Sequence, residues 1–235
     1  AADAGAAYDE QIEVDLALLE PMVAKPHAPD NVCTIREVEG TRVNQVVIGS
    51  AAGGSLKDLL RAANALSGRK VHPEVDLIVS PGTRQAYLDA IACGAIAKIL
   101  ASGARIAEPG CGACFGNAYL PGSHGVSVRT FSRNHAGSAG VREAMVYLAS
   151  PEAAAATAVV GALADPRGLG KPAPSPLPRR SAEAPGAVTP PPRNASAVEI
   201  HRGPNIRPLP PVDPLTVELS ATVLLNLGDN VSTAQ

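Results

Sequence analysis

The segment VNQVVIGSAAGGSLKDLLRAANALSGRKVHPEVDLIVSPGT, residues 43–83, contains a complete strand–helix–strand unit. Its first part, VNQVVIGS, is a short apolar run that is typical of a buried strand. Ser55 is a good helix N-cap with Asp58 at the third helical position, and Gly68 marks the end of the helix. The run VDLIVS, residues 75–80, predicts the next strand. Strands joined in this way lie parallel, with a right-handed crossover.

The same alternation continues along the chain. Thr83 begins a helical stretch that Gly94 and Gly103 divide, and ARIAEPG then predicts a short strand. GVSVRTFS, residues 125–132, predicts another strand, and Ser150 followed by Pro151 begins a last helix. We therefore predict an α/β fold, a three-layer α/β/α arrangement with a mostly parallel sheet.

Composition excludes several classes of protein. The chain has 235 residues, a net charge of −2 and only 3% aromatic residues, which argues against a nucleic-acid partner. No stretch approaches the roughly 20 apolar residues that span a bilayer, so we expect no membrane segment. Four cysteines do not make a disulfide framework in a chain of this size, which favours a reduced, cytoplasmic setting.

Proline content suggests how the chain is divided. Residues 1–166 carry the strand and helix patterns, and residues 167–214 form a proline-rich, extended linker with KPAPSPLPRR and TPPPRNAS. Residues 215–235 contain the apolar pattern TVELSATVLLNLGDN, which predicts a terminal strand. That strand has no partner nearby in sequence, so we expect it to pair with another chain or with further sequence.

Three small-residue loops follow predicted strands: GSAAGGS (residues 49–55), EPGCGACFGN (residues 108–117) and FSRNHAGSAG (residues 131–140). Functional loops of a parallel sheet lie at the carboxyl ends of its strands, so we expect these three to share one edge. Glycine lets the backbone approach a ligand closely. The loop before Ser55 suits an anion, and Arg133 is either a solvated charge or a clamp for a carboxylate.

Cys111 and Cys114 have the C-x-x-C spacing of several kinds of site. No helix pattern follows Cys114, which argues against a thioredoxin-type redox pair. Zinc needs further ligands, for which His124 and His135 are candidates. Iron–sulfur ligation and two small buried residues in a tight turn are the other interpretations. Cys93, in an apolar helix pattern, and Cys33 are expected to be structural thiols.

The three loops together resemble the aconitase and isopropylmalate dehydratase hydro-lyases. EPGCGACFG resembles that family's G-C-G-P-C-x-G segment, VVIGSAAGGS resembles I-G-S-C-T-N-S/G, and TFSRNHAGSAG resembles T-S-N-R-N-F-x-G-R. VDLALLEPMVAKPHAPDNV resembles the entry into the family's third domain, and VEIHRGPNIRPLPPVDPL resembles its linker to a fourth, swivelling domain. The resemblance implies that residues 1–166 are the third α/β domain and residues 215–235 the opening strand of the swivel domain.

The resemblance also implies site residues and a cofactor. Cys111 and Cys114 would be metal ligands of a [4Fe–4S] cluster, and Arg133, Asn134 and Ser50 would bind substrate. The expected activity is dehydration and rehydration of a carboxylated hydroxy acid such as aconitate or citrate. The acid/base machinery would come from other aconitase-type domains, in the same or another chain.

The chain departs from the family at functional positions. Ala51 stands where the family has its first cluster cysteine, and Ser132 and Ser138 replace an asparagine and a substrate arginine. Two thiolates cannot hold a [4Fe–4S] cluster in the family manner, which uses three. Either another ligand replaces Ala51, a different metal centre is used, or the cluster is absent. The alternative function is therefore a cluster-free member that serves as a carboxylate-binding, scaffold or regulatory subunit.

Overall fold

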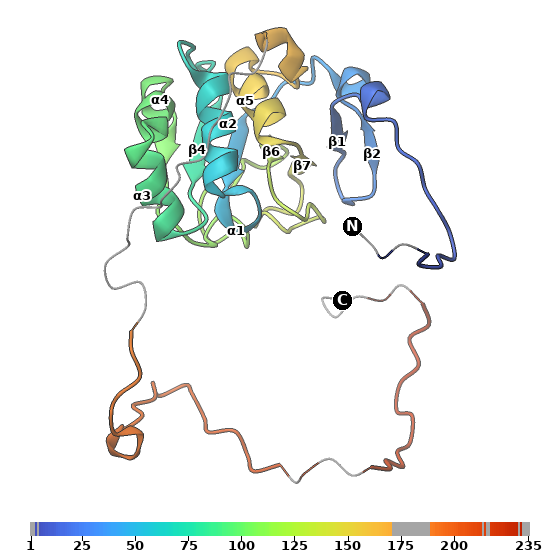
Figure 1. Cartoon of the computed structure of the whole chain (residues 1–235), viewed down its shortest axis with the longest axis vertical. Coiled ribbons are helices and arrows are strands. Elements are labelled where there is room, and N and C mark those ends of the chain that lie inside the picture. The colour runs from blue at the N-terminus through green and yellow to red at the C-terminus, as the bar shows by residue number, and fades with distance from the viewer. Residues whose placement is uncertain are drawn as a thin grey trace. The chain divides into compact units, whose positions relative to one another are not determined.

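The computed structural model describes residues 3, 5–170, 189–212, 214, 217–229 and 231. It divides the chain into two units, residues 1–188 and 189–235 (Figure 1). The predicted linker segment KPAPSPLPRR lies outside the described residues. The elements that carry the loops of interest all belong to the first unit.

The first unit contains a seven-stranded sheet in the order β2-β1-β7-β6-β3-β4-β5. Its strands are β1 (Met22–Ala24), β2 (Val32–Thr34), β3 (Gln45–Gly49), β4 (Asp76–Ser80), β5 (Arg105–Ile106), β6 (Val126–Arg129) and β7 (Met145–Leu148). The pairs from β7 to β5 are parallel, and β1 pairs antiparallel with both β2 and β7. The α/β class and the mostly parallel sheet are confirmed.

Helix boundaries follow the capping signals in the sequence. The helices are α1 (Ser50–Gly53), α2 (Leu56–Leu66), α3 (Arg84–Ala92), α4 (Ala95–Ala101) and α5 (Pro151–Val160). Ser55, Thr83 and Ser150 each accept a hydrogen bond from a backbone N–H in the first turn of α2, α3 and α5. In α2 the Asp58 carboxylate accepts a hydrogen bond from the Ser55 N–H, which completes a capping box.

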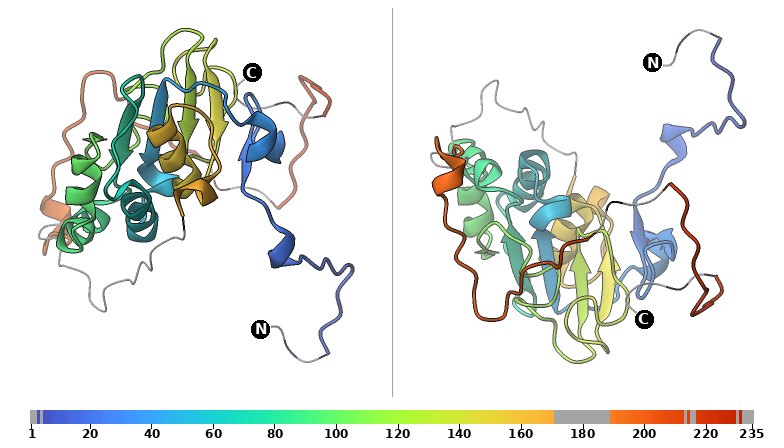
Figure 2. Two further views of the ribbon diagram at one scale, coloured as in Figure 1. Left: turned by 90° about the horizontal axis from the view of Figure 1, so that it is seen from above. Right: turned by 90° about the horizontal axis from the view of Figure 1, so that it is seen from below.

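The two faces of the sheet are covered differently. Val46 and Ile48 of β3 and Leu77 of β4 join the main core, which α2, α3, α4 and α5 cover. On the opposite face a small cluster of Val47, Ile78 and Ala113 lies under irregular chain. Figure 2 shows the helices gathered on one side of the strands and this chain on the other. The second helical layer that the sequence predicted is thus replaced, among the described residues, by a long loop.

Three strands were missed in the sequence. β1 and β2 have three residues each and β7 has four, which is too short for a clear period of two. Their identity as strands comes from pairing: Val23 lies opposite Cys33, and Ala24 opposite Leu148. Tertiary contacts therefore decide the outer half of the sheet.

The prediction that Cys93 is a core thiol is wrong, because the side chain is exposed. Gly94 adopts a left-handed conformation and separates α3 from α4, so Cys93 is the C-cap of α3. The two helices do not share one continuous apolar face at this point. Cys33 is buried, as predicted, and burial raises the pKa of its thiol.

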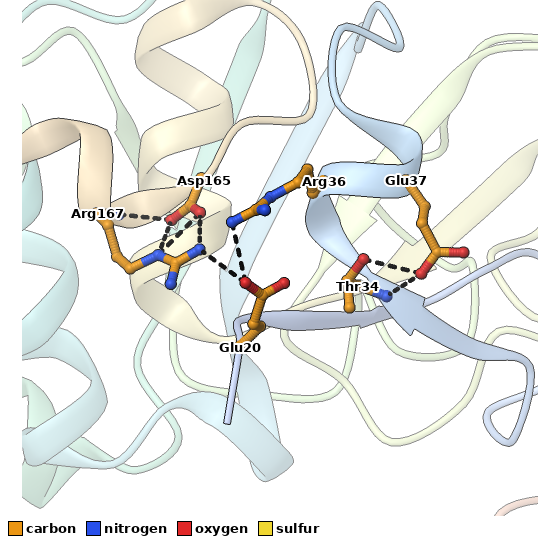
Figure 3. Close-up of polar contacts among 6 residues, drawn as sticks. All are labelled: Glu20, Thr34, Arg36, Glu37, Asp165 and Arg167. Carbon is orange, nitrogen blue, oxygen red and sulfur yellow. Dashed lines mark hydrogen bonds and ion pairs between the residues drawn. The ribbon is translucent and has the colours of Figure 1, made fainter. Parts of the chain in front are cut away.

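Ion pairs join the N-terminal hairpin to the end of the domain (Figure 3). Glu20, which precedes β1, pairs with Arg36 at 2.9 Å and with Arg167 at 3.9 Å. Arg167 also binds Asp165 at 2.6 Å, and this hydrogen bond lowers the pKa of the Asp165 carboxyl. These groups lie largely at the surface, so each pair contributes little energy alone, but together they connect residues 20–36 to residues 165–167.

The second unit has little regular structure. Its described residues contain one short helical turn, Ala195–Ala197, and residues 217–229 form no strand there. Leu224 is 94% exposed, so the apolar pattern of this segment is not buried. That residues 215–235 pair with a partner or with further sequence stays a prediction. None of the described helices is long and apolar enough to cross a membrane.

Gly49 permits the close approach of β3 and β4 where the first loop begins. Its φ is +111°, and a Cβ there would lie 1.9 Å from the Ser80 carbonyl oxygen. We predict that Gly49→Ala lowers the free energy of unfolding by about 3 kcal/mol or more, because it adds both a backbone clash and an unfavourable φ. Chemical denaturation measured by circular dichroism tests this.

Gly68→Ala is the matched control. Gly68 also has a positive φ, +73°, but a Cβ there meets nothing within 4 Å. Its cost should be limited to backbone strain, about 1 kcal/mol. Equal losses in the two variants would show that close packing at Gly49 is unimportant.

Candidate functional site

The three predicted loops meet at the carboxyl edge of the parallel strands. Ser50 directly follows β3, the cysteine loop follows β5, and Arg133 lies in the loop after β6. The Gly49 N–H donates a 2.8 Å hydrogen bond to Thr130 Oγ1, which joins the first loop to the third. Parallel strands place their carboxyl ends at one edge, so the prediction of a shared edge is confirmed.

Ser50 contacts the cysteine loop directly. Its side chain is fully buried and its φ is +64°, an unusual value for a residue other than glycine. Ser50 Oγ lies 3.1 Å from the Gly110 carbonyl oxygen and 2.6 Å from Cys114 Sγ. The predicted substrate residue Ser50 is therefore in contact with a predicted metal ligand, and its hydroxyl is occupied by protein groups.

The two cysteines share one tight turn and differ in exposure. Cys114 N–H donates to the Cys111 carbonyl oxygen at 3.0 Å, and no helix follows. Cys111 is exposed and Cys114 is half-buried, which excludes the interpretation of two buried packing residues. A hydrogen bond with Cys114 raises the pKa of the Cys111 thiol, an effect that Ser50 and Arg133 oppose.

A buried arginine holds the cysteine loop against the sheet. The Arg129 side chain is 1% exposed, and its Nη1 donates to the Ala113 carbonyl oxygen at 2.7 Å. Its Nη2 donates to the Tyr119 carbonyl oxygen at 3.2 Å and to Gln45 Oε1 at 3.1 Å, and its Nε donates to Ser127 Oγ at 3.0 Å. Burial lowers the pKa of this guanidinium to about 10.

Sequence reasoning did not single out Arg129, Gln45 or Ser127. Gln45 Nε2 donates to the Tyr119 carbonyl oxygen at 3.1 Å, and Ser127 Oγ donates to Gln45 Oε1 at 2.9 Å. The sequence did contain a signal for them. Gln45 lies in the valine-rich strand β3, and Ser127 and Arg129 alternate with valines in β6. Polar residues at alternate strand positions share one face, which here is the face that the cysteine loop covers.

Close backbone packing brings the third loop beside the second. A Cβ on Gly116 would lie 2.3 Å from the Gly140 Cα, so only glycine fits at this contact. The Arg133 guanidinium lies over the Phe115 ring, 4.5 Å from its centroid, and Arg133 is exposed. A stacked, exposed guanidinium beside the cysteine loop has the geometry to bind a carboxylate, and such binding by Arg133 stays a prediction.

Asn134 is held inside the fold, and its predicted contact with substrate stays a prediction. Asn134 is fully buried, and its Nδ2 donates to the Lys25 carbonyl oxygen at 2.7 Å and to the Val146 carbonyl oxygen at 3.0 Å. These bonds join the end of β1 to β7. Its Oδ1 has no hydrogen-bond partner among the described residues. The neighbouring side chains of Asn134 and Arg133 thus differ completely in exposure.

The predicted histidine ligands do not join the cysteines. His124 and His135 are both exposed, and the described residues contain no group of three or more His, Cys, Asp or Glu side chains that could hold a metal ion. The alternative of a zinc or two-iron site completed by either histidine therefore has no support in this structure. Ser132 is exposed and Ser138 is half-buried, so both departures from the family lie in the same loop as Arg133.

The donors present do not fit a three-thiolate [4Fe–4S] cluster. Cys111 and Cys114 supply two sulfur atoms, and Ala51, at the third ligand position, supplies none. Ala51 is exposed in α1 and lines a cavity of about 530 Å³ with Ser55, Lys57 and other residues at the starts of α2 and α3. The hydroxyl oxygen of Ser50, the residue before Ala51, already lies 2.6 Å from Cys114 Sγ.

We predict that Arg129→Met lowers the free energy of unfolding by about 3 kcal/mol, because it leaves several buried acceptors unpaired. It should also free the cysteine loop, which limited proteolysis between residues 111 and 120 would detect. Arg61→Met is the control, since Arg61 makes a half-exposed ion pair with Glu152 and should cost less than about 1 kcal/mol. A similar small loss for Arg129→Met would rule out its anchoring role.

The three loops lie within a segment whose sequence matches known proteins. The model of the aconitase family (aconitate hydratase) matches residues 36–161, which include all three loops. The chain is 44% identical over 170 residues to a 3-isopropylmalate dehydratase large subunit of Moorella thermoacetica, covering 70% of this chain and 39% of the relative. It is 46% identical over 167 residues to 3-isopropylmalate dehydratase large subunit 2 of Archaeoglobus fulgidus, covering 71% of this chain and 40% of the relative.

A homoaconitase large subunit of Thermus thermophilus is 43% identical over 170 residues, which cover 71% of this chain and 40% of the relative. The chain thus spans about two fifths of the length of the curated relatives it matches. The matched segment holds the parallel strands β3 to β7, the cysteine loop and Arg133. The chain therefore belongs to the aconitase family.

Proposed function

We propose that this chain supplies the sheet domain of a hydro-lyase that dehydrates and rehydrates a carboxylated hydroxy acid. The observation that carries the proposal is the meeting of the three loops, where Ser50 contacts Cys114 and Arg133 lies on Phe115. The relatives are named for 3-isopropylmalate and for homoaconitase, and all of these names imply carboxylated substrates. An aconitate- or citrate-like substrate belongs to the same chemical class.

Arg133 is the residue of this chain best placed to bind such a substrate. Its guanidinium is exposed above the Phe115 ring, and no carboxylate among the described residues forms an ion pair with it. The planar fork matches a carboxylate with two parallel hydrogen bonds. Stacking on Phe115 reduces the freedom that the side chain loses on binding.

The remaining parts of the active site would come from outside this segment. The chain corresponds to about two fifths of its relatives' large subunits, so the other aconitase-type domains are partners in the same or another chain. The base that removes the substrate proton would lie on those domains. Four free cysteines are consistent with a reduced, cytoplasmic location.

One observation favours a second candidate function. Ala51 removes a ligand, and the hydroxyl of Ser50 contacts the sulfur of Cys114. A cluster-free member of the family would keep the Arg133 site and bind a carboxylate without turning it over. Such a chain would serve as a scaffold or regulatory subunit.

A domain exchange separates the two functions. Residues 22–170 of this chain would replace the corresponding domain of the Moorella thermoacetica large subunit, with and without Ala51→Cys. We predict that Ala51→Cys allows iron–sulfur reconstitution and raises dehydration of 3-isopropylmalate by at least about tenfold, because it restores the third thiolate. Visible absorption and the rate of dehydration are measured after anaerobic reconstitution.

The control carries Ala52→Cys, which adds a thiol next to the family's ligand position. It should gain neither absorption nor activity. If the unchanged chimera is as active as Ala51→Cys, the cluster-free alternative is excluded. If Ala51→Cys loads iron and folds but stays inactive, the hydro-lyase proposal fails for this domain.

A further inference from the structure

We propose that Cys111 and Cys114 form a reversible disulfide in exchange with a small disulfide such as oxidised glutathione. The cysteine loop does not provide the three thiolates of a [4Fe–4S] cluster. With Ala51 at the third position, the two sulfur atoms lack the set of ligands that would keep them bound to a cluster. Two neighbouring thiols in a tight turn can also react with each other to form an internal disulfide.

The turn brings the two cysteines within reach of each other. The Cys114 N–H donates to the Cys111 carbonyl oxygen at 3.0 Å, which is the hydrogen bond of a four-residue turn. The first and last Cα atoms of such a turn lie less than about 7 Å apart. That separation overlaps the range of about 4.4–6.8 Å found across disulfides. Glycine at position 112 and alanine at position 113 add no bulky side chain between them.

The surroundings give the two sulfur atoms different roles. Cys111 is exposed, so its sulfur meets a small disulfide first. Cys114 is half-buried and lies 2.6 Å from Ser50 Oγ, which fixes the direction of its side chain. Arg129 holds the Ala113 carbonyl oxygen at 2.7 Å and so keeps the turn in place between the two cysteines. Cys111 is therefore the attacking thiol and Cys114 the resolving thiol.

The exchange balances without a cofactor. Cys111 sulfur attacks one sulfur of oxidised glutathione, forming a mixed disulfide and releasing one reduced glutathione. Cys114 sulfur then attacks the Cys111 sulfur and releases the second glutathione. The protein loses two electrons and two protons, and these are recovered in the two glutathione thiols. Excess reduced glutathione reverses both steps.

Closure would use both sulfur donors of the loop. The disulfide form cannot offer thiolates to a metal, so oxidation and metal binding at this loop exclude each other. Ser50 Oγ lies 2.6 Å from Cys114 Sγ, so closure would replace the thiol that this hydroxyl contacts by a disulfide sulfur. The redox state of the pair would thereby alter the surroundings of Ser50, the first residue after β3.

The test uses the full chain, freed of metal with a chelator and incubated in mixtures of oxidised and reduced glutathione. Free thiols are then alkylated, and the products are mapped by mass spectrometry. We expect Cys111 and Cys114 to become protected together, and Cys33 and Cys93 to be alkylated once the protein is denatured. The internal disulfide should exceed the mixed disulfide by at least about tenfold, because the second thiol is held in place.

Two variants serve as controls. Cys93→Ser removes the other exposed thiol and should leave the internal disulfide unchanged. Cys111→Ser should abolish it while circular dichroism stays the same, because Cys111 is exposed and contributes no core packing. The proposal is overturned if glutathione stays attached to Cys111 without closure, or if Cys111 and Cys114 remain fully alkylated in excess oxidised glutathione. It is also overturned if protection survives in Cys111→Ser.

Discussion

The buried guanidinium of Arg129 is the interaction on which the candidate site depends. It places a positive charge inside the protein, on the sheet face that the described helices do not cover. It binds the carbonyl oxygen of Ala113 in the cysteine loop and that of Tyr119 just after this loop. A buried donor of this kind is costly unless each of its hydrogen bonds is made. The loop supplies these acceptors, so the loop and the arginine stabilise each other and the cysteine turn has one position.

The position of that turn explains the rest of the site. Because residues 111–119 lie against β3 and β6, Ser50 at the end of β3 contacts Cys114, and Gly116 packs on the backbone of Gly140. This packing in turn places Arg133 beside Phe115. The site of this aconitase-family chain is thus built from backbone contacts between loops, and the exposed Arg133 side chain lies beside them.

The family relationship and the departures from it concern different levels of the structure. Residues 36–161, which carry β3 to β7, the capped helices and the cysteine loop, match the family's model. Ala51, Ser132 and Ser138 are the predicted departures from the family's site residues, and all three lie in the loops that follow β3 and β6. Ala51 lies in α1, a helix that forms without a thiol at that position. The predicted departures therefore concern the side chains at the site, and the family match concerns the segment that carries them.

The sequence by itself determined the parallel sheet, the caps at Ser55, Thr83 and Ser150, and the shared edge of the three loops. These follow from local hydrogen bonding and from periodicity, which neighbouring residues encode. Only the tertiary structure decided the short strands β1, β2 and β7, the exposure of Cys93, the structural role of Asn134 and the network of Arg129. Each of these depends on partners far away in sequence, and no local pattern records which partner will be close enough to form a hydrogen bond or to exclude water.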